Sequence, residues 1–272
     1  MWRGLALLIS ALVPSGAGAS DLPRVVSVNV CTDQLVLLLA EPEQIVSLSP
    51  LSVDPRTSVM AQEAVNYSTN NAQSETIAMQ NPDVVVAGAF NDPAFLRMLE
   101  SISIKVETFP ITSALSDIPD EIRKMGQVLN QSDKAEAIAA QFETDLARLP
   151  PPAEDAPLAA FFLPNGFSLG AGTLSHDILV AGGARNLSVE LGIQGNGTVS
   201  LEQVILHQPD LLIGAQPFGG FSQSEEMATH PALAAFPVLH SSVAWVCGVP
   251  SVLDAVSQVS EKVDALDALP DN

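Results

Sequence analysis

Hydrophobic and polar positions repeat one pattern at two places in the chain, residues 75–88 and residues 202–214. In both copies a glutamate, Glu75 or Glu202, opens a short segment of helical periodicity, and a Pro-Asp pair follows seven and eight residues later. The residue before a proline is pushed out of the α region, so each helix is expected to end there. An unbroken aliphatic run comes next, which is typical of a parallel strand covered on both faces. The two copies lie too far apart for a solenoid repeat, and they predict a duplicated α/β lobe.

The pattern before and around the first copy predicts a parallel α/β sheet. Residues 24–30, 45–48, 84–87 and 105–109 are strand-like. Cys31, Thr32 and Asp33 are expected to form a turn and cap before an apolar helix. Another helix is expected to begin at Asp92-Pro93.

The longest helical stretch lies between the two copies. Residues 120–129 and 133–149 predict two consecutive helices, the second with Ser132 as its N-cap. We expect the second helix to cross between the lobes as one rigid element that permits only small hinge motion. Prolines at 150–157 then predict an extended linker.

The remainder of the chain repeats the plan of the first lobe. A strand at 158–163, a glycine-rich loop at 164–172 and a helix at 174–181 capped by Thr173 precede the second copy. A strand at 242–246 and a helix at 251–266 follow it. The predicted fold is α/β: two doubly wound lobes, residues 20–122 and 158–272, joined by one long bridging α-helix and a proline-rich linker at 123–157.

The first 19 residues predict a secretory signal peptide. Arg3 precedes a short apolar run, and small residues ending at Ala17-Gly18-Ala19 form a cleavage pattern after Ala19. The apolar run is too short to span a bilayer. We therefore expect export to the periplasm, and we expect the exported protein to be a monomer.

The charge balance excludes two classes of partner. The formal net charge is −20, and no cluster of lysine or arginine is present. Such a surface repels nucleic acid and anionic membranes.

The chain contains two cysteines, Cys31 and Cys247. In an oxidising compartment a disulfide between them is the first hypothesis, because it would fasten the beginning of the first lobe to the end of the second. Two buried free thiols and a pair of soft metal ligands remain the alternatives. The four histidines show no ligand spacing that would complete a zinc site.

One motif offers an enzymatic alternative. Residues 166–170 read GFSLG, which matches the nucleophile elbow of α/β hydrolases and makes Ser168 the nucleophile of a secreted serine esterase. The elbow needs a helix directly after the serine, and here the helix is expected only from Thr173. The doubled lobe also has no place in a single-sheet hydrolase, so we expect no catalytic residue and no enzyme.

The order of the segments resembles the helix-hinged periplasmic binding proteins of ABC importers, a family that carries cobalamin, iron-siderophore complexes and haem. The likeness covers nearly the whole chain after residue 19. It rests on residues 24–35 (RVVSVNVCTDQL), the doubled unit, the helix at 133–149, residues 170–187 (GAGTLSHDILVAGGARNL) and residues 230–233 (HPAL).

The resemblance implies a docking role for Glu75 and Glu202. In that family a surface glutamate of each lobe contacts arginines of the membrane permease. A carboxylate in the first turn of a helix is favoured by the helix dipole and can receive a bidentate arginine. The other interpretation is that both residues only begin their helices.

The resemblance also implies a ligand cleft between the lobes, lined by loops at the carboxyl ends of strands. The candidate ligand-binding residues are Cys31, Ser52, Tyr67, Asn70, Phe90, Asn165, Phe167, Gln216, Phe218 and Trp245.

Aromatic and amide side chains suit a large, flat, mostly neutral ligand. No lysine or arginine cluster lies at these loops, which weakens the case for anionic citrate or catecholate complexes. We expect a metal chelate, with a corrinoid or another metal complex, such as an iron complex, ahead of haem. In the haem alternative Tyr67, the only tyrosine, ligates the iron. No resident cofactor and no metal site of the protein itself is expected.

Overall fold

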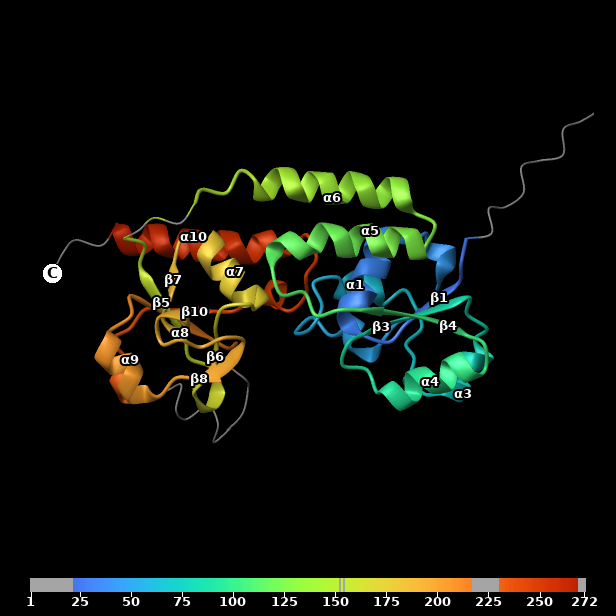
Figure 1. Cartoon of the computed structure of the whole chain (residues 1–272), viewed down its shortest axis with the longest axis horizontal. Coiled ribbons are helices and arrows are strands. Elements are labelled where there is room, and N and C mark those ends of the chain that lie inside the picture. The colour runs from blue at the N-terminus through green and yellow to red at the C-terminus, as the bar shows by residue number, and fades with distance from the viewer. Residues whose placement is uncertain (1–21, 152, 154, 217–229, 269–272) are drawn as a thin grey trace, which may run out of the picture.

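A computed structural model describes residues 22–151, 153, 155–216 and 230–268, and these residues form two α/β lobes (Figure 1). The first lobe contains, in chain order, β1 (Val25–Ser27), α1 (Val30–Leu39), β2 (Ile45–Ser47), α2 (Ala61–Ala64), α3 (Ser74–Met79), β3 (Val84–Gly88), α4 (Pro93–Ser101) and β4 (Lys105–Phe109). The second lobe contains β5 (Leu158–Phe161), β6 (Phe167–Leu169), α7 (Leu174–Ala181), β7 (Arg185–Asn186), α8 (Leu187–Glu190), β8 (Asn196–Thr198), α9 (Leu201–His207), β9 (Leu211–Gly214), β10 (Val238–His240) and α10 (Val252–Asp267).

The two sheets have the same topology. The first is ordered β2-β1-β3-β4 and the second β7-β5-β9-β10, and the strands within each are parallel. In both lobes the first strand therefore lies between the second and the third. The repeated sequence unit forms α3 with β3 in one lobe and α9 with β9 in the other. The prediction of a duplicated, doubly wound α/β fold is confirmed.

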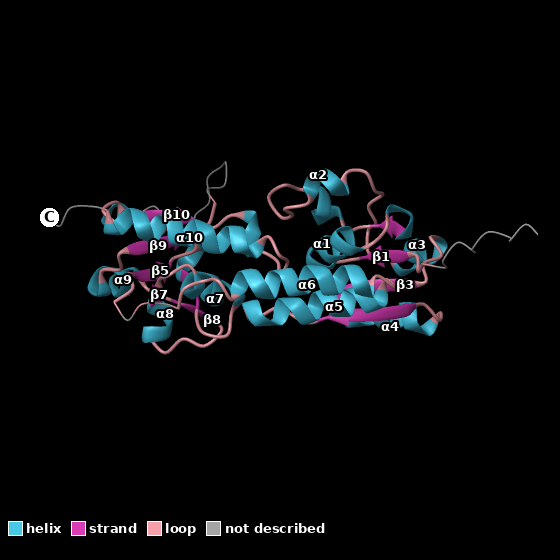
Figure 2. Cartoon of the chain, turned by 90° about the horizontal axis from the view of Figure 1, so that it is seen from above, coloured by secondary structure: helices cyan, strands magenta, loops and turns pink. Residues whose placement is uncertain are grey.

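The bridging helix predicted at 133–149 is present at Ser132–Leu146, and the helix that precedes it packs along its side. The chain forms α5 (Ile118–Val128) and α6 (Ser132–Leu146), and both views place the two helices side by side (Figures 1 and 2). A Cβ on Gly126 would lie 2.2 Å from the Cβ of Ala135, so only glycine allows this close approach. Arg123 adds ion pairs of 2.8 Å to Glu136 and Glu143. The bridging helix α6 is thus paired with an antiparallel neighbour, α5, and the expected lobe boundary at residue 122 falls inside α5.

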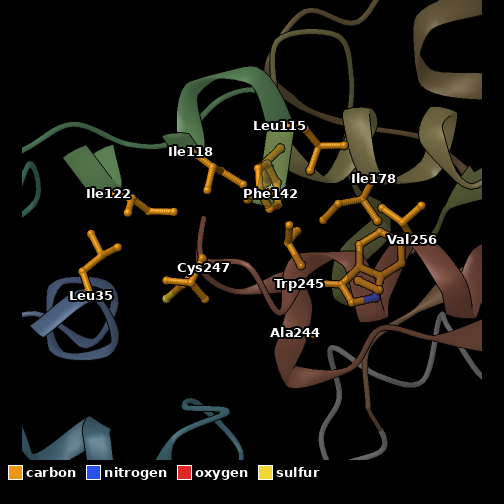
Figure 3. Close-up of a cluster of buried hydrophobic side chains, with 14 of the residues drawn as sticks. Leu35, Leu115, Ile118, Ile122, Phe142, Ile178, Ala244, Trp245, Cys247 and Val256 are labelled. Atoms are coloured by element: carbon orange, nitrogen blue, oxygen red, sulfur yellow. The ribbon is translucent and has the colours of Figure 1, made fainter. Parts of the chain in front are cut away.

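One apolar core continues from lobe to lobe. Leu35 and Ile122 lie on the first-lobe side of it, Trp245 and Ile178 on the second-lobe side, and Phe142 of α6 between them (Figure 3). A large rotation of the lobes would expose this seam to water, at roughly 25 cal/mol for each Å² of apolar surface. The shared core therefore adds to the bridging helix a second reason to expect limited hinge motion.

Three local predictions are corrected by the structure. The N-cap of α1 is Asn29, whose side chain accepts from the backbone N–H of Cys31 at 2.9 Å, so Cys31 already lies inside the helix. The last strand of the second sheet is β10, and the segment predicted as a strand at 242–246 instead contains a 3₁₀ turn, Val243–Trp245. The glycine-rich loop contains β6, which pairs antiparallel with β8. The side-chain hydrogen bond of Asn29 decides the first of these segments, and strand pairing, which short apolar runs do not encode, decides the other two.

Within the described residues, no helix has the length and apolar content needed to cross a bilayer.

Candidate functional site

A cavity of about 470 Å³ lies between the lobes. On the first-lobe side its wall comes from the start of α1 and from the loops that follow β3 and β4. On the second-lobe side it comes from the end of β6, the start of α7, the start of β8 and residues 245–248. The carboxyl ends of parallel strands open into it on the first side, which is the usual place for ligands in open α/β sheets.

The cavity wall is mainly apolar, with a few neutral polar groups. Its apolar residues are Leu35, Ala89, Phe90, Phe109, Pro110, Ile111, Leu169, Leu174, Trp245 and Val246. Its neutral polar side chains are Asn29, Thr32, Thr112, Ser113, Thr173, Ser175 and Asn196. Among the described residues that line it there is no lysine, arginine, histidine or tyrosine.

Glu121 is the one ionisable side chain among those lining residues. Burial raises the pKa of its carboxyl group, and a hydrogen bond from Thr112 acts in the opposite direction. The Thr112 hydroxyl lies 2.9 and 3.0 Å from the two carboxylate oxygens. Glu121 therefore places a single, largely buried acid on the wall of an otherwise neutral cavity.

A network of asparagines fixes the loop that carries Phe90. The side chain of Asn91 accepts from the backbone N–H of Gly88 at 2.8 Å and donates to the carbonyl of Val28 at 3.0 Å. A Cβ on Gly88 would lie 2.7 Å from the amide nitrogen of Asn29, so this position requires glycine. Phe90 lies two residues after Gly88, and with 84% of its surface exposed it stands at the cavity rim.

Trp245 is the aromatic residue of the second-lobe wall. It is only 7% exposed, and its ring packs edge-on against Phe161 with the centroids 6.0 Å apart. The neighbouring segment reaches the first lobe, because a Cβ on Gly248 would lie 2.4 Å from the hydroxyl of Thr112. Trp245 and residues 246–248 thus close the cavity from the side of the second lobe.

Cys31 and Cys247 form a disulfide, with their Cα atoms 5.2 Å apart. Cys31 lies on the cavity wall, and Cys247 follows two residues after Trp245. The bond joins the start of α1 to the segment before α10. The sequence left open a disulfide, two buried free thiols or a pair of metal ligands, and the structure has the disulfide.

Several candidate residues lie away from this cavity. Ser52 and Asn70 are buried; the Ser52 hydroxyl donates to the Ser49 carbonyl, and the Asn70 amide donates to the Ser27 carbonyl at 2.8 Å. Both therefore hold loops at the end of the first sheet and present nothing to a ligand in this conformation. Tyr67 is partly buried against the core.

The second lobe contains the rest of these outlying candidates. Asn165 occupies a turn with φ of 59°, and Phe167 begins β6; neither lines the cavity. Gln216 is exposed after β9. Phe218 lies outside the described residues. Of the ten candidates, the structure brings together Cys31, Phe90 and Trp245 at the cavity.

The sequence interpretation missed the polar lining, including Glu121, Thr112 and Asn196. A signal was present for Glu121, because it lies on the apolar stripe of α5 between Ile118 and Met125. A carboxylate on a buried stripe is unusual enough to mark a site.

Ser168 has no exposed surface. Its hydroxyl donates to the Phe161 carbonyl at 2.7 Å and lies 2.6 Å from the Ser188 hydroxyl. It sits in a strand paired with β8 and no helix follows it directly, so the geometry does not match a nucleophile elbow.

Glu75 and Glu202 are exposed in the first turns of α3 and α9. Hydrogen bonds from the backbone of Glu202 and from Ser200 lower the pKa of the Glu202 carboxyl group. In Figure 1, α3 and α9 lie toward opposite ends of the molecule, on the side away from α6. The helices that carry the two carboxylates therefore lie on the same side of the molecule, one in each lobe.

Comparison with known proteins agrees with the two-lobed fold described above. The family model described as "periplasmic binding protein" matches residues 25–240. No curated protein sequence matches the chain.

Several solved structures share the fold. The periplasmic heme-binding protein RhuT from Roseiflexus sp. RS-1 is 19% identical, with a TM-score of 0.68 over 90% of this chain and 98% of its own. The periplasmic vitamin B12 binding protein BtuF of Vibrio cholerae is 19% identical, with a TM-score of 0.65 over 91% and 99%. A periplasmic heme binding protein from Pseudomonas aeruginosa is 20% identical, with a TM-score of 0.64 over 91% and 92%.

Proposed function

Because the chain belongs to the periplasmic binding protein family, we propose that it captures a metal chelate between its lobes and delivers it to the permease of an ABC importer. The ligand enters the cavity that separates the sheets, and the permease contacts Glu75 and Glu202. The fold neighbours that bind heme or vitamin B12 support a metal chelate as the class of ligand.

The observation that carries this proposal is the chemistry of the cavity wall. A mostly apolar surface with hydroxyl and amide groups suits a flat ligand that stacks on Phe90 and Trp245 and hydrogen-bonds at its edges. The described lining residues offer no cation for a strongly anionic chelate. They also offer no histidine, tyrosine, methionine or free cysteine to coordinate a metal. These features favour a chelate whose metal is already fully coordinated, and a corrinoid is the first choice.

Haem is the second candidate, since two of the three solved structures described above are heme-binding proteins. In this case Tyr67 ligates the iron. Tyr67 lies in the loop before Asn70 and outside the residues that line the cavity, so haem would need a binding position nearer to β2.

The same proposal extends to the cellular location and the oligomeric state of the protein. We infer that residues 1–19 direct export and that cleavage after Ala19 releases a monomer into the periplasm. The protein works by binding, and the buried position of Ser168 removes the basis for the esterase alternative.

A titration of the chain from Ser20 onward tests the function. Trp245 is then the only tryptophan, and it lies on the cavity wall, so its fluorescence reports directly on the site. We expect cyanocobalamin to quench this fluorescence with a Kd well below about 10 μM, or roughly −7 kcal/mol. Haem and ferric citrate are compared in parallel, and loss of the haem absorbance shift in Tyr67→Phe would establish the second candidate. If no chelate binds below that concentration, the proposed ligand class is wrong.

A further inference from the structure

The two copies of the repeated unit share an exposed apolar residue as well as a glutamate. Met79 follows Glu75 by four positions, and Leu206 follows Glu202 by four positions. Residues four apart lie next to each other on one face of a helix. Each unit therefore presents a carboxylate and an apolar side chain together, one helical turn apart.

These apolar side chains take no part in the fold of their lobes. Met79 is 87% exposed and Leu206 is 78% exposed, whereas the residues that anchor the two helices, Ile77 and Val204, are fully buried. Single exposed apolar residues are common on protein surfaces and need no explanation. Here the same exposure recurs at equivalent positions of two lobes whose sheets have the same strand order.

We propose that Met79 and Leu206 are docking residues, and that each pairs with its neighbouring glutamate to form one recognition unit for the permease. This inference rests on the proposed function and adds to it the contact that the carboxylates alone do not provide. The partner is a membrane protein that presents, at two places, an arginine or lysine beside an apolar pocket. The net charge of −20 and the two exposed carboxylates complement such a basic surface.

The ion pairs and the apolar contacts are expected to contribute differently to permease binding. An exposed ion pair contributes little affinity in salt, because counterions screen it. An apolar side chain that enters a pocket contributes affinity that salt does not screen, and such buried anchors dominate most interfaces. Met79 and Leu206 therefore supply salt-independent affinity, while Glu75 and Glu202 orient the complex.

The test compares two double variants for binding to the permease that takes up the protein's ligand, reconstituted in nanodiscs. Met79→Gln with Leu206→Gln removes the apolar groups while keeping good helix formers in place. Glu75→Gln with Glu202→Gln removes the charges. The control is Val65→Gln, which replaces an apolar residue that is 65% exposed after α2.

We expect the first double variant to bind at least about tenfold more weakly at both about 50 mM and about 500 mM salt. The second is expected to bind more weakly only at the lower salt concentration, and the control to bind like the wild type. Ligand titration and thermal unfolding of each variant establish that the fold is intact.

Wild-type affinity in the Met79 and Leu206 variant would overturn this inference and leave the proposed function standing. Absence of permease binding by the wild-type protein would overturn both. Concentration-dependent dimerisation of the wild type, abolished by the same variant, would assign these residues to contacts between copies of the chain instead.

Discussion

Cys31 and Cys247 join the two lobes of the molecule at the wall of its cavity, across 216 positions of sequence. The α5 and α6 pair is the other covalent path from lobe to lobe. The Sγ atom of Cys31 also lies 3.8 Å from the carbonyl oxygen of Val246, so the disulfide holds the segment after Trp245 against the start of α1. One wall of the cavity is therefore fastened by covalent chemistry as well as by packing.

The first prediction concerns this bond. Replacing both Cys31 and Cys247 by serine is expected to lower the free energy of unfolding. The chain-entropy model gives about 5 kcal/mol as an upper value for a loop of this length. Urea unfolding of the wild type and of the double variant measures the difference.

Reductant supplies the control for the disulfide. It should destabilise the wild type to about the level of the double variant and leave that variant unchanged. Equal stability of the oxidised and reduced wild type would show that packing alone holds the wall.

The second prediction concerns Glu121. Glutamine at this position can still form a hydrogen bond with Thr112, while the cavity wall loses its one negative charge. At pH 8 we expect Glu121→Gln to bind ferric citrate, an anionic complex, more tightly than the wild type does, because a like charge is removed. Cyanocobalamin affinity is expected to change much less.

Fluorescence titration of Trp245 with both ligands checks this effect. Thr112→Val, which removes the hydroxyl and keeps the charge, is the matched comparison. If both Glu121→Gln and the wild type exclude ferric citrate equally, the charge of Glu121 does not select the ligand.

Local signals explain which parts of the fold could be predicted from the sequence. The aliphatic runs of β3 and β9 and the cap residues Asp92 and Thr173 act within a few positions, and the structure has the corresponding elements where they are expected. The turn that brings α6 back onto α5 depends on the contact of Gly126 with Ala135, which is a tertiary feature.

The same distinction between local signals and tertiary contacts applies to the residues of the candidate site. Phe90 lies two residues after the end of β3, and its place at the cavity could be predicted from that strand alone. Asn196 reaches the cavity only because β8 pairs with β6, and Ser52 and Asn70 are drawn inward by hydrogen bonds to neighbouring loops. Position after a strand thus predicts the edge of the sheet, while side-chain pairing decides which residues face the ligand.

The third prediction is a pH dependence set by Asp33. This carboxyl group is fully buried and accepts hydrogen bonds from the backbone N–H and the hydroxyl of Ser49. Burial raises its pKa from 3.8 to about 6, although hydrogen bonds from Ser27 and Ser49 lower it in part. The folded protein therefore holds this proton more tightly than the unfolded chain does. The corresponding stability is present below about pH 4 and is lost as the pH rises to about 6.

Urea unfolding at a series of pH values measures this loss, which amounts to about 3 kcal/mol for a shift of this size. Asp33→Asn should remove this component of the dependence of the unfolding free energy on pH. Asp54→Asn is the matched comparison, because Arg56 lowers the pKa of Asp54 to about 2 and its contribution is lost only as the pH falls below 4. If the unfolding free energy of Asp33→Asn changes between pH 4 and 6 as much as that of the wild type, Asp33 is not the source of this pH dependence.

The last prediction concerns the exposed carboxylates of the repeated units. Glu75→Arg combined with Glu202→Arg is expected to abolish uptake of the ligand, because two positive charges would face the arginines expected on the permease. Ligand affinity should stay at the wild-type level, since neither residue lines the cavity. An arginine in the first turn of each helix opposes the helix dipole, at a cost of about 0.3–1 kcal/mol each, which leaves the fold intact. Uptake of labelled ligand by cells that carry each variant, together with titration of the purified proteins, measures both effects.

Glu63→Arg with Glu261→Arg makes the same change of charge at one exposed position in each lobe, and it should support normal uptake. Normal uptake by the Glu75 and Glu202 variant would show that these residues only begin their helices.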